Sequence, residues 1–186
     1  MKNYFIKSAI QLSQCPQDNT SEGCFIGRSN VGKSTLINTI AKSKIAKTSK
    51  RPGMTQTLNF YNINDKRLVD LPGYGYAKLD RNKKIELTDL ISDYIQNRKN
   101  LTTIFQIIDA SVITEYDQWV SKFIRNNTNL KYYVVVNKID KLNQSQSHNL
   151  KIKIADYLKI DSDNLITISA LKQKNISELI KIIKNI

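Results

Sequence analysis

Residues 27–34 have the types and the spacing of a loop that binds phosphate. Their sequence, GRSNVGKS, fits the pattern GxxxxGK[ST], whose glycines let successive backbone N–H groups point at one anion. We expect the exposed ammonium of Lys33 to reach the β- and γ-phosphates of a nucleoside triphosphate, and the Ser34 hydroxyl to ligate Mg²⁺ between them. The apolar run 24–26 precedes the loop and a helix-like segment, 35–41, follows it. This order favours a nucleotide site over a chance glycine-rich turn.

A second stretch, Asp70-Leu71-Pro72-Gly73, follows a strand-like run and has the pattern DxxG. The Asp70 carboxylate at the end of the strand is expected to hold Mg²⁺ through a water molecule. Gly73 has no side chain, so its N–H is expected to approach the γ-phosphate. By itself the stretch also fits an ordinary turn after a strand. The phosphate loop upstream favours its interpretation as part of a nucleotide site.

A third stretch, residues 137–140, ends an apolar run with Asn-Lys-x-Asp and indicates the base. The Asp140 carboxylate can accept hydrogen bonds from N1–H and the 2-amino group of guanine, whereas adenine would leave it unpaired. We expect Asn137 on the O6/N7 side of the base and the Lys138 stem against the ring face. The Ala170 backbone N–H, after the last strand-like run, is expected to reach O6. A solvated loop is the alternative for residues 137–140.

The length of 186 residues predicts one domain, 1–186, with a core of its own. No apolar stretch approaches the roughly 20 residues that cross a bilayer, so we expect no membrane span. Residues 1–10 lack the apolar core and cleavage site of a leader, and the two cysteines, Cys15 and Cys24, are expected to be ordinary thiols. These features predict a cytoplasmic protein.

The net charge of +13 favours a polyanionic partner such as RNA, because clustered lysines and arginines release counterions from phosphates. Most of the basic residues are lysines, however, and the chain is also rich in Ile and Asn. An AT-rich genome would produce the same composition without any binding function, so the charge alone leaves both explanations open.

The elements expected to position these residues alternate between strands and helices, which predicts an α/β sheet with helices on both faces. The turn at Asn64-Asp65 predicts a hairpin, and hence one antiparallel edge strand in an otherwise parallel sheet of six strands. The expected strands are 23–27, 57–63, 66–70, 101–109, 131–137 and 164–168. The expected helices are 34–43, 81–97, 114–126, 143–159 and 175–185.

The motifs in this order are typical of a small GTPase, and three longer blocks narrow the resemblance. Residues 27–38, 52–61 and 70–77 closely resemble the EngB (YihA/YsxC) family of bacterial ribosome-biogenesis GTPases, and the block DLPGYGYA is its most specific part. The resemblance covers nearly the whole chain. It implies a P-loop NTPase fold, the Ras-like G domain, that binds GTP and GDP with Mg²⁺.

The resemblance also implies switch segments at 44–56 and 71–82. Thr48 and Thr55 are both candidates for the threonine that closes on Mg²⁺ and the γ-phosphate, and the preceding Pro52-Gly53 selects Thr55. Lys33, Thr55, Gly73 and Asn30 are the expected catalytic residues. The expected nucleotide contacts are Gly27, Arg28, Ser29, Asn30, Val31, Gly32, Lys33, Ser34, Thr35, Pro52, Gly53, Met54, Thr55, Asp70, Leu71, Pro72, Gly73, Asn137, Lys138, Ile139, Asp140, Ile168, Ser169 and Ala170.

Slow intrinsic hydrolysis is expected, because Tyr74 follows Gly73 where many GTPases have a glutamine that orients the attacking water. Asn30 resembles a residue that in several GTPases helps to hold K⁺ beside the phosphates, although capping of the loop would explain it equally well. Asp109 receives no role. Trp119 is expected in the core with Phe123. His148, Asp161 and Asp163 are expected to carry no chemistry.

The resemblance implies a switch in assembly of the large ribosomal subunit, with a subunit precursor and its rRNA as partners and a link to normal cell division. We expect a monomer. Basic residues in and beside the first switch are candidate RNA contacts or a solvated loop: Lys42, Lys44, Lys47, Lys50 and Arg51. Two alternatives are a P-loop kinase or ATPase acting on a small substrate, and an RNA-binding module with a vestigial nucleotide site. Residues 137–140 oppose the first, and the intact Lys33, Ser34 and Asp70 oppose the second.

Overall fold

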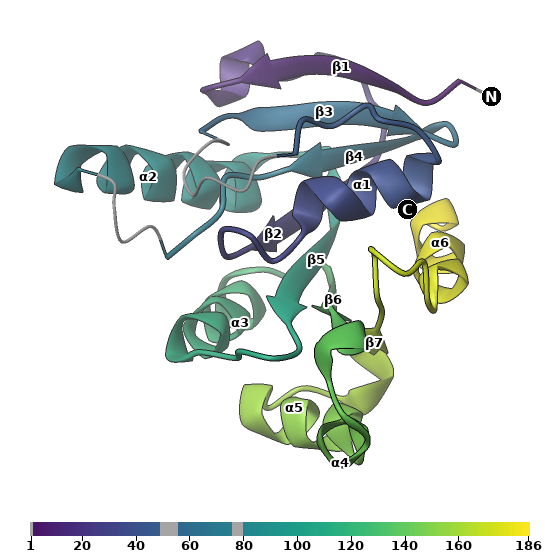
Figure 1. The fold of residues 1–186 in the computed structure, drawn as a ribbon. Coiled ribbons are helices and arrows are strands. Elements are labelled where there is room, and N and C mark those ends of the chain that lie inside the picture. Colours follow the sequence, from purple (N-terminus) through teal and green to yellow (C-terminus); the bar gives the residue numbers. More distant parts are fainter. Residues whose placement is uncertain (1, 49–55, 76–79) are drawn as a thin grey trace.

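The computed structural model describes residues 2–48, 56–75 and 80–186, which form a seven-stranded sheet in the order β1-β3-β4-β2-β5-β6-β7 (Figure 1). From β4 to β7 in this order the strands pair in parallel, so their carboxyl ends meet at one edge of the sheet. The predicted motifs follow several of these strands and are therefore brought together. The strands are β1 (Tyr4–Ala9), β2 (Glu22–Gly27), β3 (Leu58–Ile63), β4 (Lys66–Asp70), β5 (Leu101–Asp109), β6 (Lys131–Asn137) and β7 (Leu165–Thr167).

The predicted α/β class and the hairpin are confirmed. β3 and β4 pair antiparallel, and the turn between them places Asn64 and Asp65 at φ 52° and 60°. Two consecutive residues in the left-handed region are what a type I′ turn requires, and Asn and Asp tolerate that region better than most residues. The turn residues thus select the tight hairpin that the sequence indicated.

The edge of the sheet differs from the prediction, because a seventh strand lies outside β3. β1 pairs antiparallel with β3, so the antiparallel strand β3 is an interior strand and β1 forms the edge. Only Ala9 of β1 is buried, and Tyr4 and Phe5 remain 47% and 45% exposed. A strand with so little buried surface has no continuous apolar run and no clean alternation, which explains why the pattern did not reveal it.

Helices cover both faces of the sheet (Figure 1). α1 and α6 pack on one face against side chains such as Ile107 and Val135, while α2, α3 and α5 pack on the other with neighbours such as Ile108 and Val136. This division follows the alternation of side chains along β5 and β6. The helices are α1 (Lys33–Ala41), α2 (Arg81–Asn97), α3 (Glu115–Asn127), α4 (Gln144–Ser147), α5 (Leu150–Leu158) and α6 (Ile176–Lys184). No helix in the described ranges is long and apolar enough to span a membrane.

The helix expected over 143–159 is in fact two helices. α4 ends at Ser147, the next residue, His148, has an extended ψ of 125°, and Asn149 follows at φ 55° before α5 begins. Asparagine adopts this left-handed conformation more readily than most residues, and a single such residue interrupts a helix. His148 thus lies at the end of a short helix, where no catalytic role was expected.

Trp119 is on the surface of α3, which corrects the expectation that it belongs to the core. Its side chain is 58% exposed, and its ring stacks on Phe123 with centroids 5.6 Å apart. The two residues share one side of the helix as their spacing predicted. The side that faces the sheet carries Val120 and Ile124 instead.

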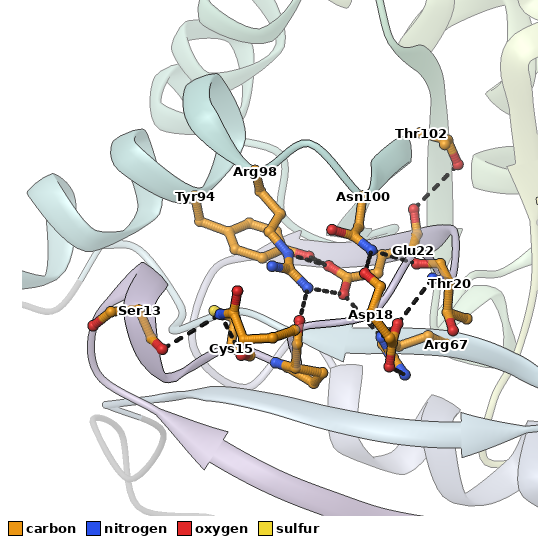
Figure 2. Close-up of polar contacts among 12 residues, drawn as sticks. Ser13, Cys15, Asp18, Thr20, Glu22, Arg67, Tyr94, Arg98, Asn100 and Thr102 are labelled. Carbon is orange, nitrogen blue, oxygen red and sulfur yellow. Dashed lines mark hydrogen bonds and ion pairs between the residues drawn. The ribbon is translucent and has the colours of Figure 1, made fainter.

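Polar side chains fasten the amino end of β2, the end remote from the phosphate loop (Figure 2). Glu22 is fully buried and accepts hydrogen bonds from the Tyr94 hydroxyl at 2.8 Å and from Arg98 Nη2 at 2.6 Å. Arg67 joins the group through Glu22 and through two 2.7 Å bonds to Asp18. Because each of these buried charges is paired, the central strand is held firmly at this end.

Candidate nucleotide and magnesium site

The phosphate loop connects β2 to α1, and two of its glycines are required by packing. A Cβ on Gly27 would lie 2.3 Å from the carbonyl oxygen of Ile107, and a Cβ on Gly32 would lie 2.5 Å from Asn137 Nδ2. Gly32 also has φ 100°, a conformation that side chains disfavour. The loop is therefore pressed against the ends of β5 and β6, with the N-terminus of α1 directed toward the expected phosphates.

Lys33 opens helix α1 and is buried, with 8% of its surface exposed, contrary to the expectation of an exposed cation. Its Nζ donates a 3.2 Å hydrogen bond to the carbonyl oxygen of Gly27, so the side chain lies back across the loop. Burial lowers the pKa of Lys33, and the nearby Asp70 carboxylate offsets part of this effect. A cation in such a position gains strongly from a bound anion, because it has already lost its water.

Ser34 and Asp70 meet at the point where Mg²⁺ is expected. The Ser34 hydroxyl donates to Asp70 Oδ2 at 3.0 Å. The other oxygen, Oδ1, is buried and has no hydrogen-bond partner among the described residues. Burial raises the pKa of Asp70, against the influence of Lys33 and Ser34. A hydroxyl beside a carboxylate oxygen without a partner is an oxygen donor set that fits Mg²⁺.

Asn137 links the phosphate loop to the loops at the base end of the site. It is 2% exposed, and its Nδ2 donates to the Val31 carbonyl at 2.8 Å. Its Oδ1 accepts the backbone N–H groups of Lys138 at 2.8 Å and Ala170 at 3.0 Å. The Ala170 N–H expected at guanine O6 thus bonds to Asn137 in this structure. The contacts of both residues with the base stay predictions.

Asp140 and Ser169 come from two loops that lie side by side. The backbone N–H of Ile139 donates to the carbonyl of Ile168 at 3.2 Å, and the Ser169 hydroxyl donates to Asp140 Oδ1. Asp140 is exposed, at the centre of a 3-10 turn over Ile139–Lys141. The serine therefore orients a carboxylate that faces outward, as the predicted recognition of guanine requires.

Asp109 has a structural role that the sequence pattern did not reveal. Its Oδ2 lies 2.7 Å from Lys138 Nζ, which also donates to the carbonyl of Asn30. Burial acts to raise the pKa of Asp109, but hydrogen bonds from Lys138 and Ser111 outweigh it and lower that pKa. Asp109 pairs with Asn137 in the register of β5 and β6. Its position at the end of a strand next to β6 was the feature of the sequence that could have indicated this role. The ion pair fixes the Lys138 stem.

Gly73 follows β4 alongside the phosphate loop. The N–H of Leu71 donates to Phe25 O at 3.0 Å, and the N–H of Tyr74 donates to Gly27 O at 3.3 Å. The segment from Asp70 to Tyr74 thus continues the parallel pairing with β2 beyond the end of β4. The contact of Gly73 with the γ-phosphate stays a prediction. The Tyr74 hydroxyl is directed into the protein, where it donates to Asp117.

Part of the predicted site lies outside the described residues, namely Pro52, Gly53, Met54 and Thr55. Lys50 and Arg51 lie outside them as well. Their roles stay predictions. The remaining predicted contacts lie on the loops just described and on the first turn of α1: Arg28, Ser29, Thr35 and Pro72.

A phosphate loop, an oxygen donor set for Mg²⁺ and an outward-facing carboxylate on one edge of a mostly parallel sheet define a GTP-binding protein of the P-loop class. Residues 22–138 match the family model described as 50S ribosome-binding GTPase. The chain is 50% identical over 177 residues to the probable GTP-binding protein EngB of Mycoplasmoides gallisepticum, covering 95% of each chain. The chain therefore belongs to the EngB family of GTPases.

Other comparisons agree with this assignment. The probable GTP-binding protein EngB of Mycoplasma genitalium is 48% identical, over 95% of this chain and 92% of its own. A crystal structure of a probable GTP-binding protein engB matches with a TM-score of 0.74 and 26% identity, over 89% of this chain and all of that one. Era from Aquifex aeolicus, bound to GDP and aluminium fluoride, matches with a TM-score of 0.71 and 28% identity, over 90% of this chain and 57% of its own.

Proposed function

We propose that this GTPase is a switch in assembly of the large ribosomal subunit, binding the maturing particle in its GTP form and leaving after hydrolysis. The observation that carries the proposal is the match of residues 22–138 to a family described as 50S ribosome-binding GTPases. The net charge of +13 suits rRNA as the contacted component. A structural neighbour, Era, has been solved with MgGDPNP and a segment of 16S ribosomal RNA, with a TM-score of 0.68 and 28% identity.

The proposed cycle runs in the cytoplasm, on a monomer, with Mg²⁺ as cofactor, and its failure would disturb cell division. Ser34 and Thr55 would hold the ion directly and Asp70 through water. Bound there, Mg²⁺ would draw together the β- and γ-phosphates and neutralise their charge. The residues of the chain do the rest: Lys33 pairs with the phosphates, and the phosphate loop orients them.

The direct experiment is co-sedimentation of the purified protein with large-subunit precursors. We expect the protein to pellet with these particles in the presence of a non-hydrolysable GTP analogue and to remain in the supernatant with GDP. Mature small subunits provide the specificity control. Equal pelleting in both nucleotide states would contradict the switch, and equal binding to small subunits would contradict the choice of particle.

Binding to the particle should also fall steeply with salt, through cations beside the first switch. Each phosphate neutralised by the protein contributes roughly 0.7 to 0.9 to the slope of log affinity against log salt. Neutralising Lys47, Lys50 and Arg51 together should therefore flatten that slope by about two to three units. The measurement is a salt titration of co-sedimentation with the GTP analogue bound.

A matched variant separates a local footprint from the charge of the whole protein. Lys153, Lys181 and Lys184 are exposed on α5 and α6, and neutralising them removes the same three charges. We expect this second variant to retain the slope of the unmodified protein. Equal slopes for both variants would show that attraction is diffuse, as a charge produced by genome composition would be.

Potassium is expected to accelerate GTP hydrolysis relative to sodium at equal ionic strength. Asn30 has φ 65° and holds an exposed position in the phosphate loop, and its carbonyl is fixed by Lys138. An Asn30 side chain that helps to hold K⁺ near the phosphates would place positive charge where it stabilises the transition state. The Asn30→Ala variant should then show the same rate in both salts. Identical rates in the unmodified protein would rule out this use of potassium.

A further inference from the structure

A buried polar network joins the phosphate loop to helix α3 through Arg28, a predicted nucleotide contact, and through residues to which no role has yet been given. Its centre is Asp117, which is fully buried in the first turn of α3. Its Oδ1 accepts a 2.8 Å hydrogen bond from the Tyr74 hydroxyl. Its Oδ2 accepts from the backbone N–H and hydroxyl of Thr114, both at 2.9 Å, and lies 3.3 Å from Arg28 Nε. Both carboxylate oxygens are thus engaged.

Tyr74 is held in place by hydrogen bonds of both its backbone and its side chain. The backbone lies in a parallel bridge with Arg28, with Tyr74 N–H donating to Gly27 O and Ser29 N–H donating to Tyr74 O, each at 3.3 Å. The hydroxyl, besides donating to Asp117, accepts from Gln106 Nε2 at 2.9 Å. Burial and the Asp117 carboxylate raise the pKa of Tyr74 well above its ordinary value, so the hydroxyl remains a donor.

Arg28 provides a second connection from the loop to the same carboxylate. It is the residue after Gly27, and its Nη2 donates to the carbonyl of Val112 at 2.6 Å while Nε faces Asp117. The guanidinium therefore bridges the phosphate loop to the segment before α3. Two neighbouring backbone segments, the phosphate loop and the segment that contains Gly73, are therefore both held by the buried Asp117 carboxylate.

We propose that Asp117 is a positioning residue for GTP hydrolysis, which acts through Tyr74 and Arg28 to fix Gly73 relative to the phosphate loop. Gly73 immediately precedes Tyr74, so the anchored tyrosine sets where the Gly73 N–H can meet the γ-phosphate. The proposal rests on that expected role of Gly73 and does not depend on ribosome binding. GDP lacks the γ-phosphate, so the affinity for GDP does not depend on the network. The affinity for GTP and the rate of hydrolysis do depend on it.

The test is the Tyr74→Phe variant, which removes one hydroxyl and keeps the ring. We expect kcat for GTP to fall roughly tenfold, the factor that one lost hydrogen bond to a charged group represents. Affinity for a non-hydrolysable GTP analogue should fall by a similar factor, while affinity for GDP stays within about twofold. Asp117→Asn should change the same quantities in the same direction. The double variant should lose less than the sum of the two, because both changes act on one contact.

The opposite end of β2 supplies a matched control, Tyr94→Phe (Figure 2). Tyr94 also donates a 2.8 Å hydrogen bond to a fully buried carboxylate, that of Glu22, and burial likewise raises its pKa. We expect Tyr94→Phe to lower the melting temperature about as much as Tyr74→Phe while leaving kcat and the preference for the GTP analogue over GDP unchanged. Equal effects of the two variants on kcat would overturn the proposal, because they would reflect stability alone.

Two further variants keep the outcome decisive. Arg28→Lys weakens the ion pair without altering the core, and should reduce the preference for the GTP analogue even if the Tyr74 variant fails to fold. Gly73→Ala should abolish that preference. If Gly73→Ala abolishes it and the Tyr74, Asp117 and Arg28 variants retain it, the network has no positioning role. If Gly73→Ala also retains it, the expected role of Gly73 fails, and the proposal fails with it.

Discussion

The Lys33→Ala variant is expected to lose GTP affinity or hydrolysis by at least about a hundredfold, the usual effect of removing a charged group that stabilises the transferring phosphate. Lys33 is buried at the start of α1, with Nζ 3.2 Å from the Gly27 carbonyl. It has already lost its hydration in the free protein, so the phosphates regain nearly the full electrostatic interaction. Titration with GTP and single-turnover hydrolysis would measure the loss.

The same burial determines the expected effect on stability. The pKa of Lys33 is lowered by burial, so keeping the amine charged at neutral pH costs the nucleotide-free protein free energy. Lys33→Met keeps most of the stem and removes the charge, and we expect its melting temperature without nucleotide to equal or exceed that of the unmodified protein. Lys181→Met, at an exposed position of α6, controls for a change in net charge. Normal GTP binding by an unstable Lys33→Met protein would show that Lys33 is structural.

Asp140→Asn is expected to exchange guanine for xanthine specificity. The predicted base contact gives the carboxylate two hydrogen bonds from guanine, and the loss of two charge-assisted bonds of about 1.5 to 3 kcal/mol each would lower GTP affinity by more than a hundredfold. An amide presents one donor and one acceptor instead, which suits the carbonyl at position 2 of xanthine. Affinity for XTP should rise accordingly. Competition of GTP and XTP for a fluorescent guanine nucleotide would measure both changes.

The Ser169 hydroxyl makes this variant a strict test, because it can donate to the amide oxygen as it donates to the carboxylate. The loop should therefore keep its shape. Asp163→Asn changes another exposed carboxylate, in the 3-10 turn over Ser162–Asn164, and should leave both affinities unchanged. Retention of normal GTP affinity by Asp140→Asn would refute the assignment of the base pocket.

The sequence predicted well the strands that are covered by helices on both faces of the sheet. β5 and β6 are nearly continuous apolar runs, since helices cover both of their faces, and the predicted bounds of both strands match the observed ones. β1 escaped detection because it lies at an edge with mostly exposed side chains. The break at Asn149 escaped it because one left-handed residue leaves the helical spacing on either side intact.

The motifs predicted which loops bind nucleotide, but they did not reveal how those loops are supported. The role of Asp109 depends on the register between β5 and β6, and that of Asp117 on the packing of α3 beside Tyr74. The degree to which Lys33 is buried likewise depends on neighbours distant in the sequence. The spacing of Trp119 and Phe123 placed them on one side of α3, but the expectation that this side faces the core was wrong for Trp119. Contacts of this kind require three-dimensional information.

Trp119 is the only tryptophan in the chain and lies on the open surface of α3. The intrinsic fluorescence of the protein therefore comes from one known place. That place is two residues from Asp117, which is joined to Arg28 and Tyr74 beside the expected phosphates. Exchange of GDP for a GTP analogue should then alter the emission without any attached dye. A partner that covers this side of α3 would shift the emission toward the blue, so the protein contains its own optical probe of both events.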